Sequence, residues 1–155
     1  MSVSTVNEGL LLSFVFFCVR MGVLIYHKGE ENMLIRQSAE DYFETIYMLK
    51  QKNGSVRAID VVNELGFSKP TVSVAMKKFR ENGFVTVDEA GHIELTDAGL
   101  AIAKKTFEKH SVLSQMLMML GVSEETALED ACRMEHGLSD ESFAAIKQHL
   151  ERAGK

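Results

Sequence analysis

Hydrophobic residues recur at helical spacing along most of the chain after residue 38. Between 38 and 52, Tyr42, Ile46 and Leu49 fall on one face, which predicts an amphipathic helix. Ser38 is the expected N-cap of this helix, and Asn53-Gly54 is expected to end it. Comparable patterns and end signals predict further helices over 58–65, 68–82, 97–119, from 123 past 133, and 139–152.

Residues 84–95 show a different pattern, with two short runs typical of strands, 84–87 and 92–95. The segment between them, Asp88-Glu89-Ala90-Gly91, is polar and contains the glycine of a tight turn. Two predicted helices joined through Gly66 precede this hairpin, and Ser68 with Pro70 marks the start of the second. The order helix, helix, hairpin predicts a mainly α fold with an N-terminal winged helix-turn-helix of three helices and a two-stranded wing.

The first 32 residues do not resemble the rest of the chain, because residues 9–26 are strongly apolar. The run is barely long enough to span a bilayer and contains Arg20, so a membrane anchor is one interpretation and an ordered extension is another. A third interpretation is that translation starts at Met33 and that residues 1–32 are upstream sequence, because the codons of residues 28–32 can contain a purine-rich ribosome-binding sequence immediately before Met33. We favour this interpretation and expect 1–32 to be a non-native or unstructured extension.

Length and charge limit the possible functions. A chain of 155 residues can hold one medium domain or two small ones. The formal net charge of −5 argues against a general polyanion binder, so DNA binding would need a local basic patch. Two cysteines in different contexts do not form a disulfide framework, which favours a reducing cytoplasm.

The candidate chemistry centres on the segment Cys132-Arg133-Met134-Glu135-His136. Cys132, Glu135 and His136 are spaced i, i+3 and i+4, so a helix would carry the three on one face. A thiolate, a carboxylate and an imidazole together form half of a divalent-metal site. The best candidates for the missing ligands are Asp41, Glu44 and His110. Metal ligands on both sides of a DNA-reading unit predict a metal-switched transcription regulator.

The candidate DNA contacts belong to the predicted helix 68–82 and its surroundings. Polar and basic residues alternate there with the expected core residues Val72, Ala75 and Phe79. Lysine and arginine side chains at such a position are expected to contact phosphates. The predicted DNA-binding residues are Arg57, Ser68, Lys69, Pro70, Thr71, Ser73, Lys77, Lys78 and Arg80.

Four ordered segments resemble the diphtheria toxin repressor family of iron- and manganese-dependent repressors. They are 41–47 (Asp-Tyr-Phe-Glu-Thr-Ile-Tyr), 68–73 (Ser-Lys-Pro-Thr-Val-Ser), 95–99 (Leu-Thr-Asp-Ala-Gly) and 132–141 (Cys-Arg-Met-Glu-His-Gly-Leu-Ser-Asp-Glu). The resemblance covers about 36–155 and is strongest for the short manganese transport regulators. It implies a winged-helix DNA-binding domain over 33–96 and a helical metal-binding and dimerisation domain over 97–155. No residues follow Lys155 for the third domain of the longer iron regulators.

The resemblance also implies a mixed ligand set. Asp41 and Glu44 match carboxylates of the manganese branch, whereas Cys132 matches the cysteine of the iron branch. His110, Glu135 and His136 match both branches, while Ser114 and Leu128 replace ancillary ligands of the iron branch. The implied function is a cytoplasmic, homodimeric repressor that binds operator DNA and controls metal homeostasis. We expect Mn²⁺, then Fe²⁺, with Zn²⁺ or Co²⁺ possible in vitro, and no membrane partner.

Other interpretations of these residues remain. Cys132 alone would more often be a small buried residue, and His110 and Glu44 alone would be ordinary helix residues. A winged-helix regulator with Cys132 as a redox thiol is the main alternative. A metallohydrolase is disfavoured, because no nucleophile or general base accompanies the candidate ligands. His92, in the wing turn, is expected to be solvated or to contact a phosphate, and His149 is expected at the surface.

Overall fold

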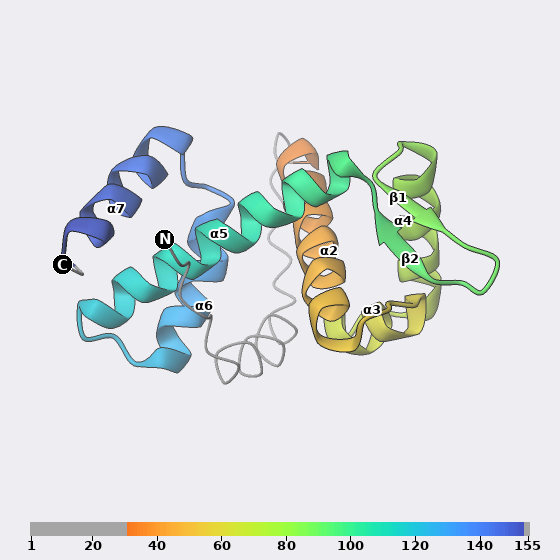
Figure 1. The fold of residues 1–155 in the computed structure, drawn as a ribbon, viewed down its shortest axis with the longest axis horizontal. Helices are drawn as coiled ribbons and strands as arrows, with labels where there is room; N and C mark the ends of the chain where they lie inside the picture. The colour runs from red at the N-terminus through yellow and green to blue at the C-terminus, as the bar shows by residue number, and fades with distance from the viewer. Residues whose placement is uncertain (1–30, 154–155) are drawn as a thin grey trace. The chain divides into compact units, whose positions relative to one another are not determined.

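The computed structural model describes residues 31–153, whose helices and strands are shown in Figure 1. The predictions for the apolar run 9–26 and for a translation start at Met33 concern residues 1–32. Most of these residues lie outside the described range. The described residues fall into two compact units, one up to Ala103 and the other from Lys104. Most of them are helical, with a single two-stranded sheet among them, so the predicted fold class is confirmed. No helix in the described range is long and apolar enough to cross a membrane.

The first helix of the described range, α2 (Glu31–Asn53), begins earlier than predicted. Ser38 lies inside this helix rather than capping it, so the predicted start was wrong. Met33-Leu34-Ile35-Arg36-Gln37 contains no glycine or proline and consists mostly of good helix formers, so the helical conformation continues upstream through it. The end at Asn53-Gly54 agrees with the prediction, and Gly54 has a positive φ of 75°.

The next two helices form the predicted helix-turn-helix. The first, α3 (Ala58–Leu65), ends at Gly66, which adopts the left-handed conformation favoured by glycine. The second, α4 (Lys69–Glu81), starts where the Ser68 side chain accepts a hydrogen bond from the Thr71 amide. Both helices therefore have the ends that their sequence signals predict.

The wing follows α4 as two antiparallel strands, β1 (Val85–Val87) and β2 (Ile93–Leu95), with Val85 opposite Leu95. Its base is joined closely to the start of the next helix, α5 (Asp97–Met119). Thr96 donates its hydroxyl hydrogen to the Gly83 carbonyl oxygen at 2.7 Å, and the Thr96 amide donates to the Phe84 carbonyl oxygen at 3.0 Å. Gly99 is packed so tightly that an added Cβ would lie 2.2 Å from that same Phe84 oxygen.

The core of the first unit gathers apolar side chains from α2, α3, α4 and the wing. Aromatic rings lie at its centre: Phe43 contacts Phe79 edge-on at 4.7 Å between ring centroids, and Phe84 at 5.3 Å. The fully or nearly fully buried members are Tyr42, Phe43, Ile46, Leu49, Val56, Val61, Leu65, Val72, Met76, Val85, Ile93 and Ala103. This packing fixes α4 with its opposite face exposed.

The second unit consists of the later part of α5 together with α6 (Glu124–Glu135) and α7 (Asp140–Ala153). Ser123 caps α6 by accepting a hydrogen bond from the Thr126 amide, as the sequence predicts. Leu113, Ala127, Leu128 and Ala131 are buried in this unit, whereas α7 has no fully buried residue.

Candidate metal centre and DNA-reading surface

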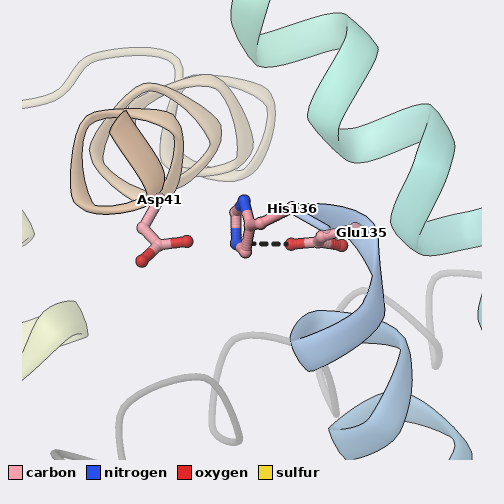
Figure 2. A group of neighbouring side chains, drawn as sticks. All are labelled: Asp41, Glu135 and His136. Atoms are coloured by element: carbon pink, nitrogen blue, oxygen red, sulfur yellow. Dashed lines mark ion pairs between the residues drawn. The ribbon is translucent and has the colours of Figure 1, made fainter. Parts of the chain in front are cut away.

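Three predicted ligands of the second unit lie together at the C-terminal end of α6. Glu135 is the last residue of the helix and His136 is its C-cap. His136 Nε2 lies 3.3 Å from Glu135 Oε1 (Figure 2). His110, on α5, reaches the same carboxylate with Nδ1 at 2.9 Å from Glu135 Oε2. One carboxylate therefore lies between two imidazoles.

Burial determines the chemical state of His110. Its side chain is only 1% exposed, and burial together with the nearby His136 lowers its pKa to about 3. The imidazole is therefore neutral at physiological pH, which is the form that binds metals. When Nδ1 donates its hydrogen to Glu135, Nε2 is the atom that carries a lone pair for a metal ion.

The fourth candidate in this unit, Cys132, is a partly buried cysteine on α6. It precedes Glu135 by three residues, so the helix places both on neighbouring positions of one face. A thiol there suits a metal ligand, and it also suits the redox interpretation. Its role remains a prediction.

The structure adds a residue that the sequence did not indicate. Lys109 is largely buried, with 11% of its side chain exposed. Its ammonium donates to the Leu138 carbonyl oxygen at 3.0 Å and lies 3.5 Å from the Glu135 carbonyl oxygen and from Asp140 Oδ1. It thereby fastens the segment between α6 and α7 to α5, directly beside the candidate ligands. The only signal in the sequence is that Lys109 is adjacent to His110.

The other two predicted ligands belong to the first unit. Asp41 and Glu44 occupy successive turns of α2; Glu44 is buried and Asp41 is partly buried. Asp41 is drawn with the sticks of Figure 2. A buried carboxylate is costly unless positive charge compensates it.

The residues of the second unit fit a divalent metal by their chemistry. Glu135 is 2% exposed, so its carboxylate needs a counter-charge that a divalent ion can supply. A neutral, buried histidine and a partly buried second histidine provide nitrogen donors beside it.

A second functional surface lies on α4. Val72 and Met76 are buried, and the side turned away from them carries the exposed residues predicted to contact DNA. The helix contains four basic residues and one acidic residue in a chain whose net charge is −5, so it forms the local basic patch that DNA binding requires. The exposed predicted contacts on or before α4 are Ser68, Lys69, Pro70, Thr71, Ser73, Lys77, Lys78 and Arg80.

Profiles of two known domains match this chain. Residues 34–93 match the N-terminal DNA-binding domain of iron-dependent repressors, and residues 96–154 match their metal-binding and dimerisation domain. The chain belongs to the iron-dependent repressor family. It is thus a metal-dependent, DNA-binding transcriptional repressor of metal homeostasis. The predicted resemblance to the diphtheria toxin repressor family and its manganese branch is confirmed.

Relatives in this family cover most of the chain. An uncharacterised helix-turn-helix transcriptional regulator of Methanocaldococcus jannaschii is 36% identical over 118 residues, which are 75% of this chain and 94% of that protein. The transcriptional regulator MntR of Escherichia coli is 33% identical over 119 residues, 77% of each chain. MntR of Bacillus subtilis is 32% identical over 109 residues, 70% of this chain and 77% of that one.

Solved structures give the same result for the fold. A manganese-dependent transcriptional repressor in complex with manganese is 28% identical with a TM-score of 0.67, covering 73% of this chain and 52% of that one. The manganese regulator SloR is 26% identical with a TM-score of 0.65, covering 73% and 53%. The chain spans about half the length of these structures.

One further predicted DNA contact of this repressor, Arg57, lies beside the wing. The residue precedes α3 and forms a β-bridge with His92. An Arg57 guanidinium nitrogen lies 3.3 Å from His92 Nε2, and His92 Nδ1 lies 3.0 Å from Asp88 Oδ2. His92 is therefore not a freely solvated loop residue, because Asp88 and Arg57 flank its ring, and its bonds lower the pKa of Asp88. His149 is exposed, as expected.

Proposed function

We propose that this repressor responds chiefly to Mn²⁺, with Fe²⁺ as the second candidate, and that it binds operator DNA as a cytoplasmic homodimer without catalytic activity. The observation that carries the proposal is the buried Glu135 carboxylate between His110 and His136. Oxygen and nitrogen donors of this kind suit Mn²⁺, whereas a thiolate shifts affinity toward Fe²⁺, Co²⁺ or Zn²⁺. MntR relatives and a manganese-bound structural neighbour support the choice of metal.

The proposed ligands are His110, Cys132, Glu135 and His136 from the second unit, with Asp41 and Glu44 from the first. The inclusion of Asp41 and Glu44 rests on the sequence, since two carboxylates one helical turn apart can bind one cation. When bound, the ion supplies positive charge to the carboxylates and links their side chains. The residues of the chain position the ligands and set their protonation states.

The contribution of each residue follows from its position. By accepting the Nδ1 hydrogen, Glu135 would fix the tautomer of His110 in which Nε2 carries the lone pair for the ion. Lys109 donates to the Leu138 carbonyl oxygen at 3.0 Å, so the segment that follows α6 is held in place before ligation. An ordered half-site loses less conformational entropy on metal binding.

The proposed homodimer would present two α4 helices to the DNA. Paired half-sites about one helical turn apart, roughly 34 Å, would then be read in successive major grooves. Met119 and Leu120 are exposed apolar residues of the second unit, as expected for a subunit interface. We propose that Arg57, Lys69, Lys77, Lys78 and Arg80 contact phosphates, and that the small polar residues near the start of α4 face the bases.

The test of this proposal measures metal and DNA binding separately. Glu135→Ala and His136→Ala should each lose metal affinity in calorimetric titration with Mn²⁺ and lose metal-dependent DNA binding, while circular dichroism shows a folded protein. His149→Ala is the matched control, because this histidine is exposed on α7, and it should behave as the parent. Unchanged metal affinity in both ligand variants would refute the site.

The redox alternative is tested in the same assay. A titration of DNA binding with Mn²⁺, Fe²⁺ and Zn²⁺, repeated after a thiol-modifying reagent, distinguishes the two mechanisms. We expect DNA binding to require metal before and after reduction with excess thiol. Metal-independent binding controlled only by the thiol state would favour the redox regulator.

A further inference from the structure

One apolar side chain on the DNA-reading helix is exposed without an evident structural purpose. Val74 is 69% exposed, and it is the one large hydrophobic residue of α4 that is not at least partly buried. A sequence pattern would place a valine in the core, as it does for Val72 two residues earlier. Val74 adds nothing to the core of the first unit, so its role lies outside the fold.

The position of Val74 on the helix is central to the exposed face. Pro70 precedes it by four residues and Lys77 follows it by three, so the three share one side of α4. Val72 and Met76 lie two residues away on either side and are buried, which places Val74 nearly opposite the core. When α4 enters the major groove, this side is the one that approaches the base edges.

The surroundings of Val74 suit DNA rather than a protein partner. Basic residues Lys77 and Lys78 follow it on the next turn, and both are exposed. A single apolar residue beside lysines is not the contiguous apolar patch that marks a protein interface.

Among base edges in the major groove, one group is apolar. Thymine carries a C5-methyl group there, and contact with an apolar side chain is how proteins recognise it. We propose that Val74 reads a thymine methyl group in each half-site of the operator. The proposal rests on the DNA-binding function of the family and adds a residue that determines sequence specificity.

The test removes the Val74 methyl groups and the thymine C5-methyl group independently of each other. The full chain with Mn²⁺ selects its preferred site from a random duplex library, and each thymine of that site is then replaced by deoxyuridine, which lacks only the C5-methyl group. For the parent, we expect one such replacement in each half-site to weaken binding about four-fold, as for the loss of one buried methyl. For Val74→Ala, the same replacement should cause no further loss, because the methyl contact is already absent.

Lys104→Ala is the control, since this exposed lysine of the second unit is not among the proposed DNA contacts and Val74 stays in place. It should retain the full loss at the same thymine. Circular dichroism and an unchanged salt dependence of binding show that Val74→Ala is folded and keeps its phosphate contacts. The proposal is overturned if no deoxyuridine replacement weakens the parent, or if Val74→Ala loses as much as the parent at every thymine. If the parent binds the same duplexes in a salt-dependent manner, the DNA-binding function holds. Either outcome then refutes only the role of Val74.

Discussion

Replacing Lys109 by methionine tests how the end of α6 is held. The Lys109 ammonium donates one well-formed hydrogen bond, to the Leu138 carbonyl oxygen at 3.0 Å. The contact with the Glu135 carbonyl oxygen, at 3.5 Å, is too long to add much. Asp140 also lies 3.5 Å away, but its side chain is 71% exposed and the ion pair is screened by water. Methionine keeps the unbranched apolar stem, so the substitution removes the charge and its hydrogen bonds with little change in packing.

The expected loss follows from the one strong contact. A hydrogen bond from a charged donor contributes about 1.5–3 kcal/mol, so we expect Lys109→Met to lower the free energy of unfolding by about 2 kcal/mol. Lys105→Met is the matched control, because this exposed lysine on the same helix also pairs with Asp140, at 2.8 Å. A surface ion pair of that kind is screened by water and contributes little to stability.

Urea unfolding of the metal-free protein, followed by circular dichroism, measures both variants. With a urea dependence of about 2 kcal/mol per molar, the midpoint for Lys109→Met should fall by about 1 M, whereas that for Lys105→Met should stay close to the parent value. Hydrogen exchange of the amides from 136 to 140 should accelerate in the first variant alone. Equal midpoints for the two variants would show that the Leu138 carbonyl needs no ammonium, which would refute the structural role assigned to Lys109.

Two further predictions concern DNA and metal. Lys77→Ala should weaken binding to all duplexes and reduce the slope of log K against log salt by about 0.9. Lys104→Ala, which replaces an exposed lysine of the second unit, should leave the slope unchanged. An unaltered slope for Lys77→Ala would show that the Lys77 side chain does not contact the DNA. Cys132→Glu should sharpen the preference for Mn²⁺ over Fe²⁺ and Zn²⁺ in DNA-binding activation, because it removes the sulfur donor. Parent-like metal proportions in that variant would show that Cys132 is not a ligand.

The elements that could be predicted from the sequence are those whose ends carry their own signals. Gly66 ends α3 and Ser68 begins α4, because a left-handed glycine and a side-chain cap are local effects. The start of α2 was mispredicted because Ser38 is a good N-cap only where the preceding residues leave the helix. Residues 33–37 contain no glycine or proline that would take the chain out of the helical conformation before Ser38.

The candidate metal site was predictable in part for the same reason. Glu135 and His136 could be grouped with Cys132 from spacing alone, because one helix carries them. The hydrogen bond between His110 and Glu135 joins residues 25 positions apart on two helices, so it depends on tertiary packing. That packing also explains why Lys109 was missed, since a lysine in a helix is normally expected in solvent.

The close packing of Gly99 limits how this sequence can diverge. Any side chain there would displace the Phe84 carbonyl oxygen, which accepts the hydrogen bond of Thr96. By contrast, a Cβ added at the loop glycines Gly54 or Gly91 meets no atom within 4 Å, so asparagine, which tolerates positive φ, is an acceptable replacement. Point mutations to residues that tolerate positive φ are thus acceptable at these two turns, whereas no side chain is accommodated at the joint between the wing and α5. The glycine of the Leu-Thr-Asp-Ala-Gly segment is therefore kept by steric exclusion, independently of which metal or operator a descendant acquires.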